Sequence, residues 1–179
     1  MNIETLNFLV GLGTVGMQVL TIALLALFFV RKDFPVLSGL VGRWGMWLAF
    51  LLTLSSTAMS FYYSDVLGVV PCSLCWLQRA FIYSQVVLFG VALYKREASR
   101  IADYSIALSV VGSVFALYQH YIQMVGESPL PCPASGGDCI KRFFFEFGYV
   151  TFPLVAFSAF ALIIVLMLFV RKNRQEVLG

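Results

Sequence analysis

Four cysteines, in two closely spaced pairs, are the residues of this sequence best suited to chemistry. Cys72 and Cys75 stand in the run Pro-Cys-Ser-Leu-Cys, and Cys132 and Cys139 flank a stretch rich in Pro, Gly and Ser. Two cysteines three residues apart can close a tight ring, and such pairs are typical of thiol–disulfide exchange. A structural disulfide and half of a metal site remain alternative interpretations of the first pair.

We expect the first pair to lie at the head of a helix. Pro71 is favourable at the first helical position, where its missing N–H costs nothing. Both Cys72 and Cys75 would then occupy the first turn, where free N–H groups and the helix dipole stabilise a thiolate. A thiolate is the form of cysteine that attacks disulfides.

Arg79 stands four residues after Cys75, so on a helix it would lie one turn further along the same face. A guanidinium inside a membrane span is costly and is usually functional. We therefore predict that Arg79 binds an oxygen-bearing, membrane-soluble electron acceptor beside Cys75. The alternative is that Arg79 extends back to the lipid head groups.

The second pair is expected in a flexible loop, because Pro, Ser and Gly residues separate Cys132 from Cys139. One interpretation is a structural disulfide that only staples the loop. The other is an exposed disulfide that the thiolate of a partner protein can attack.

The elements that position these cysteines must be membrane helices. The chain of 179 residues is 60% hydrophobic and 12% charged, whereas ordinary soluble domains carry about 25% charged residues. Five stretches that contain no formal charge except Arg79 can each cross about 30 Å of hydrocarbon. They are 5–30, 44–64, 66–94, 104–126 and 147–170. Since lipid cannot satisfy backbone polar groups, each stretch is predicted to be helical.

The basic residues predict the orientation of these spans. Most of the 12 Lys and Arg residues follow the first, third and fifth spans, so these ends are expected to be cytoplasmic. The N-terminus would then lie outside and the C-terminus in the cytoplasm. Segments 64–74 and 127–146, and with them all four cysteines, would lie outside, where disulfides persist.

The first span is expected to be retained rather than cleaved, because no basic residue precedes it and Arg31-Lys32 follows it in place of small residues. Its run Gly11-x-Gly13-x-x-Gly16 fits a dinucleotide fingerprint, but no strand precedes it. We interpret the three glycines as a surface for close helix packing.

Taken together, these residues resemble the DsbB family of bacterial membrane thiol:quinone oxidoreductases. The resemblance rests on Cys72-x-x-Cys75-x-x-Gln78-Arg79, Tyr118-Gln119-His120 and Cys132…Gly137-Asp138-Cys139. The short second-pair loop is similar to that of the compact BdbC-type members. The family core of four helices would correspond to residues 44–170, so the span 5–30 is an addition to it.

The resemblance implies an all-α polytopic protein of the bacterial cytoplasmic (inner) membrane. It would be a single membrane domain over residues 1–179, formed by a four-helix bundle plus one additional N-terminal transmembrane helix. The implied enzyme re-oxidises a DsbA-like thioredoxin-fold oxidase. The partner's thiolate would attack Cys132, Cys139 would exchange with Cys72, and Cys75 would pass the electrons to ubiquinone or menaquinone.

The resemblance also implies that Arg79, His120 and Gln78 bind the quinone. From the residues alone, His120 is equally well an interfacial hydrogen-bonding group, and Gln78 a polar contact between helices. The alternative function is a non-catalytic membrane protein with structural external disulfides. A zinc site formed by all four cysteines is a further alternative. We expect no metal, no nucleic-acid partner, and contact with membrane lipid.

Overall fold

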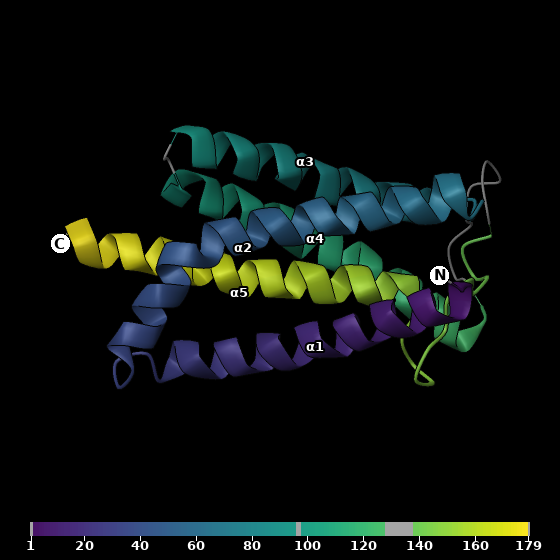
Figure 1. Cartoon of the computed structure of the whole chain (residues 1–179), viewed down its shortest axis with the longest axis horizontal. Coiled ribbons are helices and arrows are strands. Elements are labelled where there is room, and N and C mark those ends of the chain that lie inside the picture. The colour runs from purple at the N-terminus through teal and green to yellow at the C-terminus, as the bar shows by residue number, and fades with distance from the viewer. Residues whose placement is uncertain (1, 96–97, 128–137, 179) are drawn as a thin grey trace.

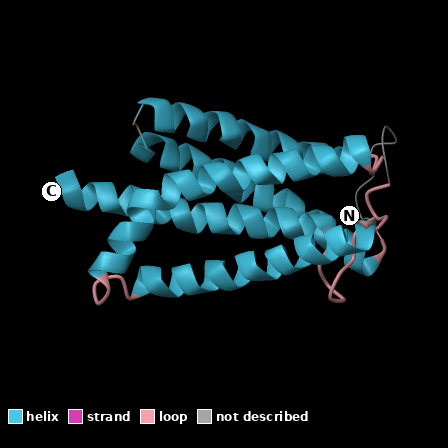
Figure 2. Ribbon diagram, in the orientation of Figure 1, coloured by secondary structure: helices cyan, strands magenta, loops and turns pink. Residues whose placement is uncertain are grey.

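The computed structural model describes residues 2–95, 98–127 and 138–178, and the regular elements in these ranges are helices (Figure 2). In chain order they are α1 (Ile3–Phe29), α2 (Pro35–Phe61), the π-helical turn η1 (Tyr62–Val66), α3 (Ser73–Lys95), α4 (Ala98–Val125) and α5 (Phe152–Leu178). In the described part of the chain, 5 helices are long and apolar enough to cross a membrane. The predicted all-α fold with five spans is confirmed.

The helices run alternately in opposite directions along the long axis of the molecule (Figure 1). Helices α2, α3, α4 and α5 form a four-helix bundle in which each helix packs against its two neighbours. Helix α1 lies outside this bundle and packs against α5. The predicted four-helix bundle with an additional N-terminal helix is therefore confirmed.

Helix α5 is the most buried of the five helices, because it contacts α4, α2 and α1. Phe160, Ile163 and Met167 on α5 are fully buried and belong to the main hydrophobic cluster. Lipid tails are as apolar as these side chains, so the contacts stabilise the bundle through close packing rather than through removal from water.

Polar side chains inside the bundle are hydrogen-bonded between helices. The Gln85 amide of α3 donates to Ser109 Oγ of α4 (3.0 Å) and accepts from Ser105 Oγ (2.7 Å). All three side chains are buried. Such pairs join α3 to α4 at a depth where no water is available.

The connections between the helices lie at the two ends of the bundle (Figures 1 and 2). One end carries the start of α1, the segment 67–72 and the described part of the α4–α5 connection, 138–151; we call it the cysteine end. The opposite end carries the α1–α2 connection and the end of α5, and we call it the basic end. Its basic residues include Arg31, Lys32, Arg43, Lys95, Arg100, Arg171 and Lys172.

Each helix begins at a residue other than the one predicted from charge, and the differences are largest for α2 and α3. Helix α2 begins at Pro35 rather than at 44, because Arg43 has an exposed side chain and a charge near a helix end does not stop the helix. Helix α3 begins at Ser73 rather than at 66. Helix α2 continues through η1 to Val66, and the segment 67–72 is then needed to reverse the chain direction.

A tight turn delays the start of α5 and explains one of the three glycines in α1. Glu146 and Val150 form an isolated bridge, and Phe147 has a φ of 52° in the turn between them. A Cβ atom on Gly11 would lie 2.9 Å from Cε2 of Phe147, so glycine permits this contact. A Cβ atom on Gly13 or Gly16 would meet no atom of another element within 4 Å. The interpretation of all three as a helix-packing surface was therefore wrong.

Gly112 of α4 is required for the packing of α4 on α5. A Cβ atom there would lie 2.5 Å from Cζ of Phe160, whose ring is fully buried. Gly112→Ala is expected to lower the free energy of unfolding by about 1–3 kcal/mol, the usual cost of overpacking. The midpoint of thermal unfolding in detergent measures this. Gly13→Ala is the matched control and should be neutral or slightly stabilising; equal losses for both variants would contradict the prediction.

Candidate active site

Cys72 occupies the N-cap position of α3. Its carbonyl accepts a hydrogen bond from the N–H of Trp76 (3.0 Å), and its Sγ accepts one from the N–H of Cys75 (3.4 Å). The sulfur therefore takes the place that a serine or threonine oxygen takes in an ordinary cap. The prediction for Pro71 needs correction: it precedes the cap instead of opening the helix, and only Cys75 lies in the first turn.

The two sulfurs at the head of α3 interact directly. Both residues carry free thiols, and the Sγ atoms of Cys72 and Cys75 lie 2.8 Å apart. Cys72 is only 3% exposed. Its hydrogen bond with the Cys75 sulfur, followed by its burial, raises the pKa of the Cys72 thiol. This favours the neutral thiol form of Cys72, and either sulfur could donate the hydrogen bond between them.

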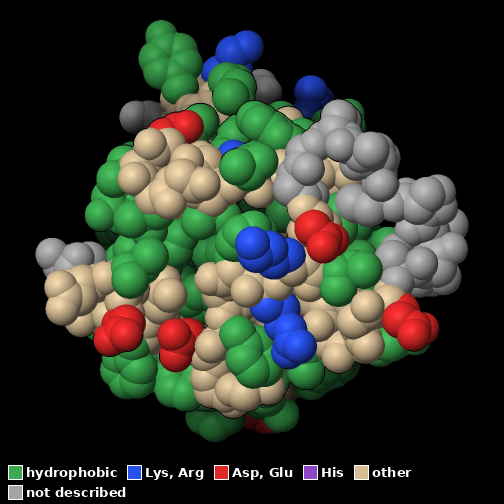
Figure 3. Space-filling view, turned by 90° about the vertical axis from the view of Figure 1, so that its right-hand side faces the viewer, with side chains coloured by type: hydrophobic (Ala, Val, Ile, Leu, Met, Phe, Trp, Pro, Cys, Tyr) green, Lys and Arg blue, Asp and Glu red, His purple; other side chains and the backbone are tan. Residues whose placement is uncertain are grey.

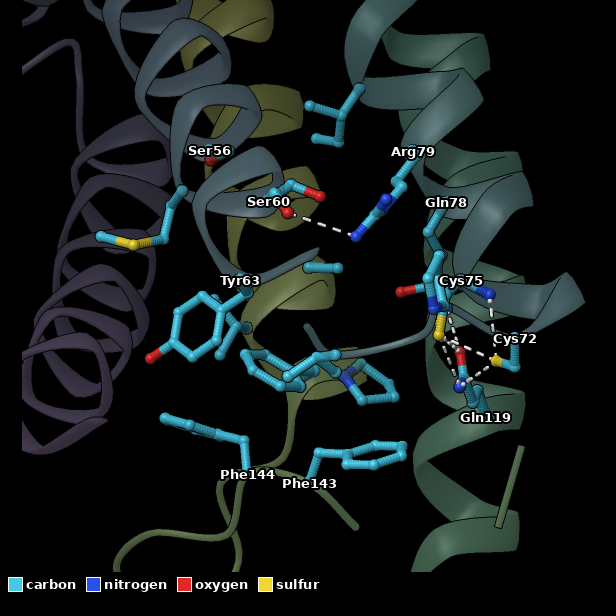
Figure 4. Close-up of a pocket in the computed structure, with 18 of the residues that line it drawn as sticks. Ser56, Ser60, Tyr63, Cys72, Cys75, Gln78, Arg79, Gln119, Phe143 and Phe144 are labelled. Carbon is cyan, nitrogen blue, oxygen red and sulfur yellow. Dashed lines mark hydrogen bonds between the residues drawn. The ribbon is translucent and has the colours of Figure 1, made fainter. Parts of the chain in front are cut away.

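Gln119 of α4 contacts both thiols, a role that sequence analysis did not assign to it. Its Nε2 atom donates to Cys72 Sγ (3.1 Å) and to Cys75 Sγ (3.2 Å), and the side chain is 1% exposed. Gln78 donates to the Oε1 atom of Gln119 at 2.5 Å. Gln78 therefore acts on the thiols through Gln119, and both glutamines form the polar floor of the site (Figure 4).

Arg79 lies one turn beyond Cys75 and points across to α2 (Figure 4). Its guanidinium donates to the Ser60 carbonyl at 3.2 Å and lies 5.3 Å from the ring centre of Trp76. Among the described residues no carboxylate lies within salt-bridge distance of it. Ser60 stands just before η1, and π-helical turns of this kind are frequent at functional sites.

A cavity of about 180 Å³ adjoins these groups at the cysteine end of the bundle. Most of its lining is apolar, and its polar lining includes the two sulfurs and Arg79. The helices that form the wall each contribute side chains, among them Val10 of α1, Met59 of α2, Ile82 of α3, Gln119 of α4 and Ala156 of α5. An apolar cavity with a few convergent polar groups is the usual form of a small-molecule site.

Helix α1 contributes to this cavity although it lies outside the four-helix bundle. Val10 lines the cavity directly, and Asn7 Oδ1 accepts a hydrogen bond of 2.7 Å from the hydroxyl of Tyr63, a lining residue. Figure 4 shows Tyr63 extending toward α1. The additional helix is thus part of the site's wall.

The structure brings Cys72, Cys75, Gln78 and Arg79 to one cavity and places His120 elsewhere. His120 is not among the lining residues, and its Nδ1 lies 2.8 Å from Oγ1 of Thr151, the residue before α5. This contact joins α4 to the start of α5. A quinone contact for His120 therefore stays a prediction that the described geometry does not support.

Cys139 of the second pair is buried beside the first pair. It is disulfide-bonded and 0% exposed, and it forms a hydrophobic cluster with Cys72 and Ile122. The expectation of an exposed cysteine in this loop was therefore wrong for Cys139. Cys132 lies outside the described residues, so its pairing with Cys139 stays a prediction. A disulfide-bonded sulfur is no thiolate ligand, which argues against the four-cysteine zinc site.

Comparison with known proteins identifies one family. The model of the family described as disulfide bond formation protein DsbB matches residues 42–170. A probable disulfide formation protein C of Bacillus cereus is 35% identical over 136 residues, which cover 75% of this chain and 93% of that protein. A probable disulfide formation protein of Metapseudomonas resinovorans is 31% identical over 128 residues, covering 70% and 88% respectively.

The disulfide bond formation protein C of Bacillus subtilis is 28% identical over 132 residues, which cover 73% of this chain and 95% of that protein. No solved structure matches the chain. The matched residues 42–170 include α3, α4, most of α2 and α5, and the cavity's cysteines, glutamines and arginine. The chain therefore belongs to the DsbB family of disulfide bond formation proteins.

Proposed function

We propose that this chain is a thiol oxidase that passes electrons from an extracytoplasmic, DsbA-like dithiol oxidase to a membrane quinone. One observation carries the proposal: Cys75 and Arg79 line the same apolar cavity within membrane-spanning helices. A free thiol lies beside a cation that has no carboxylate partner among the described residues, and both line an apolar cavity. This arrangement suits the reduction of an apolar, oxygen-bearing acceptor.

The residues of the cavity fit a quinone head group. The volume of about 180 Å³ is below the roughly 300–1,000 Å³ of sites for larger ligands, so it suits a flat head group of one or two rings whose tail extends into lipid. Arg79 uses one N–H on Ser60 and has further donors for a carbonyl oxygen. The apolar lining excludes water and suits ubiquinone and menaquinone equally well.

The electrons would move through four thiol–disulfide exchanges and one final reduction. The partner's thiolate would attack Cys132 and release Cys139 as a thiolate, and Cys139 would then attack Cys72 of the helix-head disulfide and release Cys75. The partner's second thiol would release Cys132 from the mixed disulfide, and Cys132 would attack Cys139, which re-forms the loop disulfide and frees Cys72. The Cys72 and Cys75 thiols would then supply two electrons and two protons to the quinone as their own disulfide re-forms.

The burial of Cys139 supports this order of attack. A fully buried sulfur is shielded from a large protein partner, which leaves Cys132 as the sulfur to be attacked. Cys139 instead shares a hydrophobic cluster with Cys72, the sulfur it would attack next. Gln78 and Gln119 would hold the helix-head pair at the cavity during both steps.

The charge distribution favours an outside location of the cysteine end. The basic end carries most of the Lys and Arg residues, whereas Lys141 and Arg142 are the basic residues of the described α4–α5 connection. Figure 3, which views the molecule from the cysteine end, shows few basic side chains among acidic and hydrophobic ones. Lys141 and Arg142 are exposed and lie over the rings of Phe143 and Phe145, respectively. This arrangement suits contact with lipid head groups.

Arg79→Ala should raise the KM for quinone by roughly 10- to 100-fold, the loss expected for a hydrogen bond to a charged group. The KM of Arg79→Lys should fall between those of the wild type and Arg79→Ala, because lysine keeps the charge without the planar donors. Quinone-dependent oxidation of a DsbA-like dithiol by membranes measures the effect. Arg142→Ala is the control, since this exposed arginine does not line the cavity. An unchanged KM in Arg79→Ala would refute the acceptor role.

Cys75→Ser separates an oxidase from a protein with purely structural disulfides. The variant should lose turnover while its thermal unfolding midpoint stays close to that of the wild-type chain, because Cys75 is free in the structure and staples nothing. Turnover and unfolding are measured on the same preparation. A large loss of stability, or turnover that persists, would favour the non-catalytic interpretation.

The proposed orientation is tested with single cysteines placed at opposite ends of the bundle. In a chain whose four native cysteines are replaced by alanine, Glu127→Cys and Asp33→Cys introduce one exposed thiol each. A membrane-impermeant maleimide applied to intact cells should label Glu127→Cys and not Asp33→Cys. Labelling in the reverse pattern would place the cysteine end in the cytoplasm and exclude the proposed electron route.

A further inference from the structure

We propose that Gln119 and Gln123, one turn apart on α4, are positioning residues that align the two cysteine pairs for sulfur exchange. Gln119 would stabilise the sulfur that leaves, and Gln123 would hold the segment that brings the attacking sulfur. The inference rests on the proposed function, because it assigns roles within that exchange. Neither glutamine was given a role by the spacing of the cysteines.

The hydrogen bonds fix the orientation of the Gln119 amide. Gln78 Nε2 lies 3.4 Å from the Leu74 carbonyl, which can only accept, so this end of the Gln78 amide is its donor. The same Nε2 faces the Oε1 atom of Gln119. Gln119 therefore turns its NH₂ group toward the sulfurs, with one N–H near Cys72 and one near Cys75 (Figure 4).

Two N–H donors stabilise negative charge on sulfur more than they stabilise a neutral thiol. In the exchange, the Cys72–Cys75 bond breaks and the electron pair of that bond stays on Cys75. Gln119 is already bonded to this sulfur, so the charge forms where a donor is in place. No water is needed to stabilise it, which matters at a buried helix head.

Gln123 holds the backbone of the second pair. Its Nε2 atom donates to the Cys139 carbonyl (3.3 Å) and to the Lys141 carbonyl (3.4 Å). Its Oε1 atom is buried and has no hydrogen-bond partner among the described residues. Burying an unpaired acceptor costs free energy, so an apolar residue at this position would make the fold more stable. The two contacts with backbone carbonyls therefore point to a role for Gln123 other than stability.

That role is the placement of Cys139 beside Cys72. Both sulfurs belong to one cluster with Ile122, which stands on α4 between the two glutamines and is fully buried. The thiolate released on Cys139 would attack Cys72 Sγ, forming the Cys72–Cys139 bond as Cys75 leaves. The charge moves from one sulfur to the next without a proton transfer, so this step depends on the alignment of the sulfurs and on the Gln119 donor at Cys75.

The test measures each half of the exchange in the full-length protein without quinone or partner. Gln119→Met and Gln123→Met remove the amides but keep side-chain length, and Gln119→Leu and Gln123→Leu serve as second variants if either methionine variant unfolds. Gln85→Met is the matched control, because Gln85 is an equally buried glutamine that bonds Ser105 and Ser109 instead of sulfur.

For Gln119, the reduced protein is treated with iodoacetamide over a range of pH, and alkylation of Cys75 is followed by peptide mapping. Gln119→Met should displace the alkylation profile to higher pH and slow the reaction at pH 7 by about tenfold, the effect of one pH unit. A profile that coincides with those of the wild type and Gln85→Met would overturn the role of Gln119.

For Gln123, Cys75 and Cys132 are replaced by serine, and diamide is added to accept the two electrons and two protons released as Cys72 and Cys139 join. Gln123→Met should slow this bond formation by roughly tenfold, as expected for lost alignment, while Gln85→Met should not. Equal rates would overturn the role of Gln123. Failure of wild-type membranes to oxidise a DsbA-like dithiol with quinone, with both glutamine effects intact, would instead refute the proposed function alone.

Discussion

Hydrocarbon offers no hydrogen bonds, so every polar group inside this bundle depends on another part of the chain. Gln85 meets two serines of α4, Gln78 meets Gln119, and Arg79 meets the last turn of α2. A reactive thiol faces the same constraint, because its charged form needs donors. The head of α3 provides such donors, because the backbone N–H of Cys75 and the side-chain amide of Gln119 on α4 both contact sulfur there.

The same constraint gives the thiol pair two different surroundings. Cys72 caps the helix and lies in a cluster with Cys139, a second sulfur. Both sulfurs line the apolar cavity, but Cys75 lies within the first turn, one turn from Arg79. In the proposed function, Cys72 would exchange with protein disulfides while Cys75 would face the acceptor. The pair would thus link a protein substrate to one dissolved in lipid.

The features that depend on local spacing were predictable from sequence. Charge-free stretches gave the number of spans, and the distance of three and four residues between Cys72, Cys75 and Arg79 placed them on one helix head. The role of Gln119 depends on which face of α4 meets α3, a long-range property. Its signal was the recurrence of buried polar residues along α4, from Ser105 and Ser109 onward. His120, about 100° further round the helix, faces Thr151 instead.

The contribution of α1 to the cavity wall has a practical consequence. The family match begins at residue 42, and the Bacillus cereus relative is matched over 93% of its own length, so α1 lies outside what the chain shares with that protein. Val10 and the Asn7–Tyr63 hydrogen bond nevertheless shape the cavity. An inhibitor bound between α1 and Tyr63 would contact residues of α1 that lie outside the family match, so it would discriminate this chain from any relative without such a helix.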